Sequence, residues 1–130
     1  MILFDVNVLI ALGSRDHEGK AAAERYFIDM TTSFATCPIT QTGFVRVLAQ
    51  IDRSLALTDG VAVLASICAH PRHRFMADDV DALDLPWMAI RGHQQVTDAY
   101  LAALARKHGA KLATFDRALA AVHPDVAVLV

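Results

Sequence analysis

The sequence is poor in the residue types that mark special classes of protein. Of its 130 residues, two are cysteine, four are proline and six are glycine. So little proline and glycine excludes fibrous and linker-like chains. Cys37 and Cys68 lie apart in apolar stretches and form no metal-spaced cluster. We therefore expect two buried thiols in a reducing compartment rather than a zinc site or a disulfide framework.

The chain also lacks an excess of positive charge and a long apolar run. Its formal net charge is -2, which argues against a protein that coats nucleic acid by bulk electrostatics. An enzyme that meets a phosphate backbone at one local site stays compatible with this charge. The longest uncharged apolar run, residues 61–69, is too short to span a bilayer. With no basic leader before the first apolar residues, we expect a soluble, cytoplasmic protein.

What the sequence does contain is an alternation of apolar strands and amphipathic helices. At 55% hydrophobic and 20% charged residues, the chain fits one globular domain spanning residues 1–130. Alternating strands and helices predict an α/β fold, an α/β/α sandwich around a mainly parallel sheet of four to five strands. We expect strands near residues 1–4, 34–37, 74–76, 111–114 and 126–130, and helices near residues 6–12, 16–30, 40–51, 58–69, 97–108 and 117–122.

Two of these helices have the spacing of a buried apolar face. The face consists of Phe44, Leu48 and Ile51 in residues 40–51, and of Val61, Leu64, Ala65 and Cys68 in residues 58–69. Three further residues are candidate helix caps: Asp16, Thr58 and Thr97.

The ends of these strands and helices carry acidic residues at matching positions. Asp5 follows the first strand, and Asp116 lies just past the strand that ends at Thr114. Asp98 opens the helix that precedes this later strand. In a parallel sheet, strand ends and the starts of the following helices share one edge, where ligands bind. Each acid alone is as well explained as a helix cap or a surface residue, so the three together carry the inference.

Three neighbouring carboxylates repel one another unless a cation neutralises them. Oxygen ligands without cysteine or histidine suit Mg²⁺, or Mn²⁺, better than Zn²⁺. A hard ion held in this way can activate water and bind a phosphate oxygen. The pattern therefore favours phosphodiester hydrolysis.

Four short motifs, in order, resemble those of the PIN-domain nucleases, and more narrowly the VapC-type toxins of type II toxin–antitoxin pairs. The resemblance covers nearly the whole chain. The motifs are Phe4-Asp5-Val6-Asn7, Thr40-Gln41-Thr42-Gly43-Phe44-Val45-Arg46, Val96-Thr97-Asp98-Ala99-Tyr100-Leu101 and Thr114-Phe115-Asp116.

This resemblance implies a magnesium-dependent endoribonuclease. By motif match, Asp5, Asp98 and Asp116 take the metal positions, while Asn7 and Thr114 support them. It also implies an RNA substrate, a homodimer, and a VapB-like antitoxin whose tail lies across the acidic site, with no membrane partner.

The chain departs from the family pattern at Gln41, where many relatives have Glu. Gln41 is either a further oxygen ligand in the site or an ordinary polar helix residue. One negative charge fewer predicts a single well-occupied ion, with a second ion that needs substrate phosphate. Arg46, on the same expected helix, is a candidate phosphate ligand or the partner in a structural ion pair.

Two other classes of function also place an aspartate after the first strand. A haloacid-dehalogenase-like phosphatase needs a second aspartate two residues later, where this chain has Asn7. A receiver domain needs a lysine at the end of a late strand, whereas Lys111 opens its strand. A third alternative is a binding module that keeps the fold without catalysis.

Overall fold

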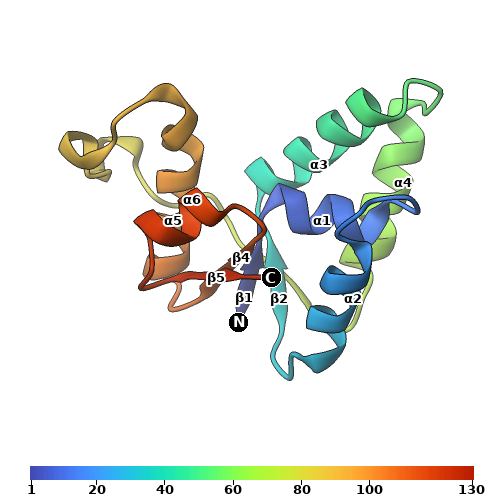
Figure 1. Ribbon diagram of the computed structural model, residues 1–130, viewed down its shortest axis with the longest axis horizontal. Coiled ribbons are helices and arrows are strands. Elements are labelled where there is room, and N and C mark those ends of the chain that lie inside the picture. Colours follow the sequence, from blue (N-terminus) through green and yellow to red (C-terminus); the bar gives the residue numbers. More distant parts are fainter.

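The computed structural model describes all residues, 1–130, as a five-stranded sheet with helices on both faces (Figure 1). Every strand pair is parallel, and the strand order is β3-β2-β1-β4-β5. This arrangement confirms the α/β prediction. The strands are β1 (Ile2–Phe4), β2 (Phe34–Thr36), β3 (His73–Phe75), β4 (Lys111–Thr114) and β5 (Ala127–Leu129).

Six α-helices connect the strands. They are α1 (Val6–Gly13), α2 (Lys20–Asp29), α3 (Pro38–Ile51), α4 (Leu57–Cys68), α5 (Val96–Lys107) and α6 (Arg117–Val122). The irregular stretch between β3 and α5 contains three short 3₁₀ helices: Ala82–Asp84, Trp87–Ala89 and His93–Gln95. None of the helices is both long enough and apolar enough to cross a lipid bilayer.

Successive side chains of the central strand β1 enter two separate hydrophobic cores. Leu3 packs with α5 and α6 residues on one face, whereas Phe4 packs with α1 and α3 residues on the other. This division follows from the alternation of side chains along a strand. Figure 1 shows the same layers, with α5 and α6 on one side of the sheet and α1 to α4 on the other. Because both faces of the sheet are covered, the ends of the central strands β1 and β4 are where Asp5 and Thr114 can form a polar cluster.

Several predicted helix boundaries are wrong. The second helix begins at Lys20, after turns, and not at the predicted cap Asp16. Helix α3 begins at Pro38, and Thr40 instead accepts a hydrogen bond from the backbone N–H of Cys37 (2.9 Å). The cap position of α4 is Ala56, and Thr58 lies inside this helix. The cap position of α5 is Gln95, and Thr97 likewise lies inside the helix.

The apolar faces predicted for α3 and α4 are only partly buried. Phe44 and Leu48 lie in the core as expected, but Ile51 is 57% exposed and Val61 is 52% exposed. The thiol prediction holds fully for Cys37, while Cys68 is half-buried; both cysteines are free.

Candidate active site

The carboxylate of Asp5 lies at the end of the central strand and has two partners. One oxygen, Oδ1, accepts a hydrogen bond from the Val6 N–H (2.7 Å), so Asp5 does cap α1. The other, Oδ2, accepts one from the Thr114 hydroxyl (2.7 Å) at the end of β4. Burial raises the pKa of Asp5, and the nearby Asp116 adds to this effect. Asp5 therefore serves as a helix cap and as part of a polar cluster.

The fully buried hydroxyl of Thr114 is the centre of this cluster. It donates to Asp5 and accepts hydrogen bonds from the Asn7 side-chain amide (3.2 Å) and the Asp116 N–H (3.0 Å). The Asn7 amide oxygen in turn accepts from the Phe115 N–H (3.1 Å). A hydroxyl can donate one hydrogen bond and accept two, so the Thr114 hydroxyl makes all the hydrogen bonds that it can. Asn7 and Thr114 thus link the ends of β1 and β4.

Asp116 and Asp98 lie at the starts of α6 and α5, the two helices that begin at this edge of the sheet. Asp116 caps α6, with its Oδ1 accepting from the backbone N–H of Ala118 (2.8 Å) and of Leu119 (3.0 Å). Asp98 lies in the first turn of α5, and its carboxylate accepts no hydrogen bond from the protein. Burial raises the pKa of Asp98 to about 6, with further contributions from the charges of Asp5 and Asp116. The structure therefore brings the three predicted acids close enough to interact.

These acids lack a counter-charge within the protein. None of the ion pairs in the structure involves Asp5, Asp98 or Asp116. Their oxygen donors suit a hard divalent cation. A cation beside them would favour the charged forms of Asp5 and Asp98, whose pKa values are raised by burial first and by neighbouring carboxylates second. In this arrangement, no three or more histidine, cysteine, aspartate or glutamate side chains converge closely enough to hold one metal ion, so the three acids are neighbours without forming a preformed metal site. The donor set still fits Mg²⁺, because proteins usually hold this ion through one or two carboxylates while it keeps several waters.

Gln41 and Arg46 lie at the same end of the sheet but outside this network. The Gln41 amide donates to the Thr36 hydroxyl (2.9 Å) at the end of β2, and it contacts the Cys68 sulfur (3.9 Å). It makes no hydrogen bond to the three acids. Arg46 is exposed and forms no ion pair; it lines a groove between α3 and α4 that also includes Gln41. The roles predicted for these two residues stay predictions.

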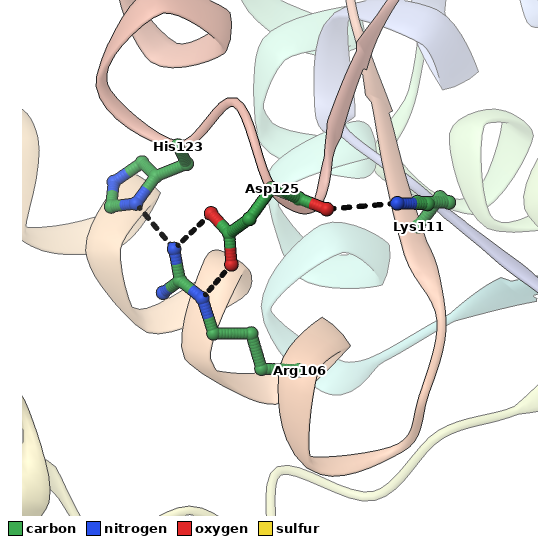
Figure 2. A network of polar contacts seen from close by, with 4 residues as sticks. All are labelled: Arg106, Lys111, His123 and Asp125. Atoms are coloured by element: carbon green, nitrogen blue, oxygen red, sulfur yellow. Dashed lines mark hydrogen bonds and ion pairs between the residues drawn. The ribbon is translucent and has the colours of Figure 1, made fainter.

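A second polar network, which no sequence motif indicates, lies at the carboxyl-terminal ends of α5 and α6, away from the acids at their starts. Arg106 on α5 binds both carboxylate oxygens of Asp125, at 2.7 and 2.8 Å, and its Nη2 donates to His123 Nδ1 at 3.1 Å (Figure 2). The hydrogen bonds from Arg106 hold the pKa of Asp125 at about 2. No sequence motif predicts this network, because Arg106 lies before β4 whereas His123 and Asp125 lie after it.

The position of Lys111 removes the receiver-domain alternative. Lys111 begins β4, so it lies at the edge of the sheet opposite the acids. Its ammonium group donates to the Asp125 backbone carbonyl (2.8 Å; Figure 2). A phosphorylated aspartate at the carboxyl edge has no lysine partner there.

Comparison with known proteins gives the family. A profile of the PIN domain matches residues 2–123. The chain belongs to the PIN-domain family. Ribonuclease VapC29 of Mycobacterium tuberculosis is 43% identical over 129 residues, which span 99% of this chain and 96% of that protein. Ribonuclease VapC38 of the same organism is 42% identical over 120 residues, with 89% of this chain and 85% of that protein covered.

Among solved structures, the M. tuberculosis toxin VapC20, described as cleaving the sarcin–ricin loop, has the same fold. The two structures superpose with a TM-score of 0.71 over 93% of this chain and 94% of that one, at 20% sequence identity. The predicted resemblance to VapC-type nucleases is thus confirmed, and the phosphatase, receiver and binding-module alternatives are not favoured.

Proposed function

We propose that this PIN-domain protein is the toxin of a toxin–antitoxin pair and a metal-dependent endoribonuclease that hydrolyses RNA phosphodiester bonds. The names of its relatives support ribonuclease activity. The observation that carries the proposal is the set of three carboxylates at one sheet edge, without a cationic partner and with the pKa of Asp98 raised to about 6. A cation placed among these carboxylates would favour their charged forms.

Asp5, Asp98 and Asp116 would hold Mg²⁺, or Mn²⁺ in its place, together with water and a phosphate oxygen of the RNA. When bound, the metal supplies a Lewis acid that neutralises charge on the phosphate and makes water a better nucleophile. Thr114 orients Asp5 by donating to Oδ2 and fixes the Asp116 backbone by accepting from its N–H. Asn7 holds β1 and β4 in register at this point.

Arg46 and Gln41 are proposed to act on the substrate side. Arg46 is exposed and free of ion pairs, so its guanidinium is available to bind an RNA phosphate through paired hydrogen bonds. Gln41 brings an uncharged oxygen to the same edge. The second metal ion would then depend on the substrate phosphate for part of its charge balance.

The acidic edge also fits the partners that the family resemblance implies. A VapB-like antitoxin that places a basic side chain over the three acids would neutralise them as a metal does and block the site. We propose this inhibition, a homodimeric assembly and a cytoplasmic site of action. Copurification of the toxin with the protein encoded beside it, followed by size-exclusion chromatography with light scattering, tests these partners together.

Cleavage of total RNA by the purified protein tests the activity itself. We expect cleavage with Mg²⁺, no cleavage with EDTA, and at least about a hundredfold loss in Asp5→Asn and Asp98→Asn. Asp52→Asn is the matched control, since Asp52 is exposed at the end of α3. Circular dichroism checks that each variant is folded. Undiminished cleavage by folded Asp5→Asn would contradict the proposal.

A further inference from the structure

A pocket of about 330 Å³ lies between α5, α6 and the 3₁₀ helix Trp87–Ala89, and Asp98 lines it. This volume is at the lower end for small-ligand pockets, which are mostly apolar with a few convergent polar groups. Here Pro86, Ile90 and Val122 provide apolar walls. The polar lining consists of Gln95 and Asp98 at the start of α5, and of Arg106 and His123 at the other end of the pocket. The mechanism above uses none of these residues except Asp98.

The two helices that line the pocket, α5 and α6, connect it to the acidic edge. Helices α5 and α6 both start at the acidic edge, where Asp98 and Asp116 interact, and run in the same direction to the Arg106–His123 hydrogen bond. The rise along α6 from Asp116 to His123 is about 10 Å at 1.5 Å per residue. A single nucleotide spans a comparable distance from its phosphate to the far edge of its base.

At the end of the pocket away from Asp98, the side chains of Arg106 and His123 present hydrogen-bond donors. Arginine cannot accept a hydrogen bond, so His123 Nδ1 accepts from Arg106 and the ring proton lies on Nε2. Figure 2 shows this second nitrogen pointing away from Arg106, and no protein group accepts its proton. His123 is only 9% exposed, and it lines the pocket. The ring is held neutral, since burial and the Arg106 charge lower the pKa of His123.

These features specify the chemistry of the occupant. Arg106 also has a free amino group, Nη1, while Asp125 balances its charge. A flat, apolar, neutral group with acceptor atoms on its edge fits such a site, and the carboxylates at the mouth repel a free anion. Sequence-specific proteins recognise RNA mainly through unstacked bases of this kind.

We propose that this pocket binds one unstacked nucleobase beside the scissile phosphate and orients it through a hydrogen bond from His123 Nε2. This inference rests on the proposed ribonuclease function. His123 and Arg106 then select the base, while the carboxylates act on the phosphate. The protein would cut RNA with a preference at one nucleotide next to the cleaved bond.

Sequencing the ends produced from a random-sequence RNA pool tests the proposal. We expect a base preference at one position next to the cut, reduced between about two- and tenfold in His123→Phe, the range for one lost hydrogen bond. Ala89→Phe fills the pocket from an exposed position and should raise KM for all sequences by about tenfold or more. Met88→Phe is the control, since Met88 is fully exposed and lies outside the pocket lining.

A binding measurement separates this proposal from the ribonuclease function. The ¹⁵N resonances of labelled His123 are followed while adenosine, guanosine, cytidine or uridine is added; saturable shifts that vanish in Ala89→Phe support the base site. If the protein cleaves no RNA, the ribonuclease function fails and these shifts alone decide the pocket. Cleavage with unchanged base preference in His123→Phe, or no shift with any nucleoside, overturns the base site. If the base site is overturned and the antitoxin binds Ala89→Phe more weakly than the wild type, the pocket instead holds a side chain of the antitoxin.

Discussion

At the scale of single residues, the hydroxyl of Thr114 holds the site together. Thr114→Val removes one donor and two acceptor positions, leaving the Asn7 amide and the Asp116 N–H without this partner. Unsatisfied buried groups of this kind destabilise by about 1–3 kcal/mol each. We expect a loss of about 2 kcal/mol in the free energy of unfolding and a clear loss of RNA cleavage.

Thr114→Ser is the matched control, because it keeps the hydroxyl and removes only a methyl group. Denaturant unfolding and RNA cleavage measured on both variants check the prediction. Similar activity in the valine and serine variants would show that the hydroxyl does not orient the acids.

Asp98 should make the metal-free protein less stable as the pH rises. Its pKa is about 6 in the folded protein against a reference value of 3.8, so between these values the folded state binds more protons than the unfolded state. Stability then falls as pH rises through this window. In EDTA, Asp98→Asn should be the more stable protein at about pH 7, and this advantage should shrink towards about pH 4.

Thermal unfolding of both proteins across this range measures the effect. Adding Mg²⁺ at neutral pH should raise the melting temperature of the wild type more than that of Asp98→Asn. A difference between the two proteins that does not change with pH would rule out the ionisation of the buried Asp98 carboxyl as its source.

At the scale of elements, a close approach of α1 and α3 fixes the position of Asp5. A Cβ atom at Gly43 on α3 would lie 2.7 Å from Val6 Cγ2, the residue after Asp5. Valine has a stiff side chain, so the backbone must move. Gly43→Ala should destabilise by about 1–3 kcal/mol and lower activity by shifting Asp5.

Gly60→Ala provides the control, because Gly60 lies in α4 and its added Cβ meets Val45 Cγ1 at an ordinary 3.6 Å. This change should stabilise by about 0.5–1 kcal/mol through helix propensity and leave cleavage unaltered. Denaturant melts with cleavage assays compare the two. Unchanged stability and cleavage in Gly43→Ala would show that α3 is not specially close-packed against α1.

The strands and helices themselves follow from sequence periodicity, but their caps do not. Asp16 and Thr58 are good cap residues, and neither caps a helix here. Turns follow Asp16, and α2 begins only at Lys20. At the start of α4, the Asp59 carboxylate accepts a hydrogen bond from the Ala56 N–H (3.1 Å). Cap choice depends on the path by which the chain enters each helix, and single-sequence patterns do not contain that path.

At the scale of the whole molecule, topology explains why part of the site could be read from the sequence. Asp5 and Asp116 each follow a strand of a parallel sheet, so the fold class alone brings them to one edge. The Arg106–His123–Asp125 network has no such rule behind it. Its contacts depend on how far α6 and β5 lie from α5, which is set by packing in three dimensions.

The charge of the whole edge determines how many metal ions it holds. With three acids and the neutral Gln41, we expect calorimetry without RNA to find one Mg²⁺ site. Gln41→Glu adds a carboxylate beside Thr36 and should tighten Mg²⁺ binding by roughly tenfold. Gln50→Glu is the matched control, because Gln50 is exposed near the far end of α3 and should leave the affinity unchanged. Two tight sites in the wild type, or an equal effect of both substitutions, would show that the missing charge at Gln41 does not limit metal binding at this edge.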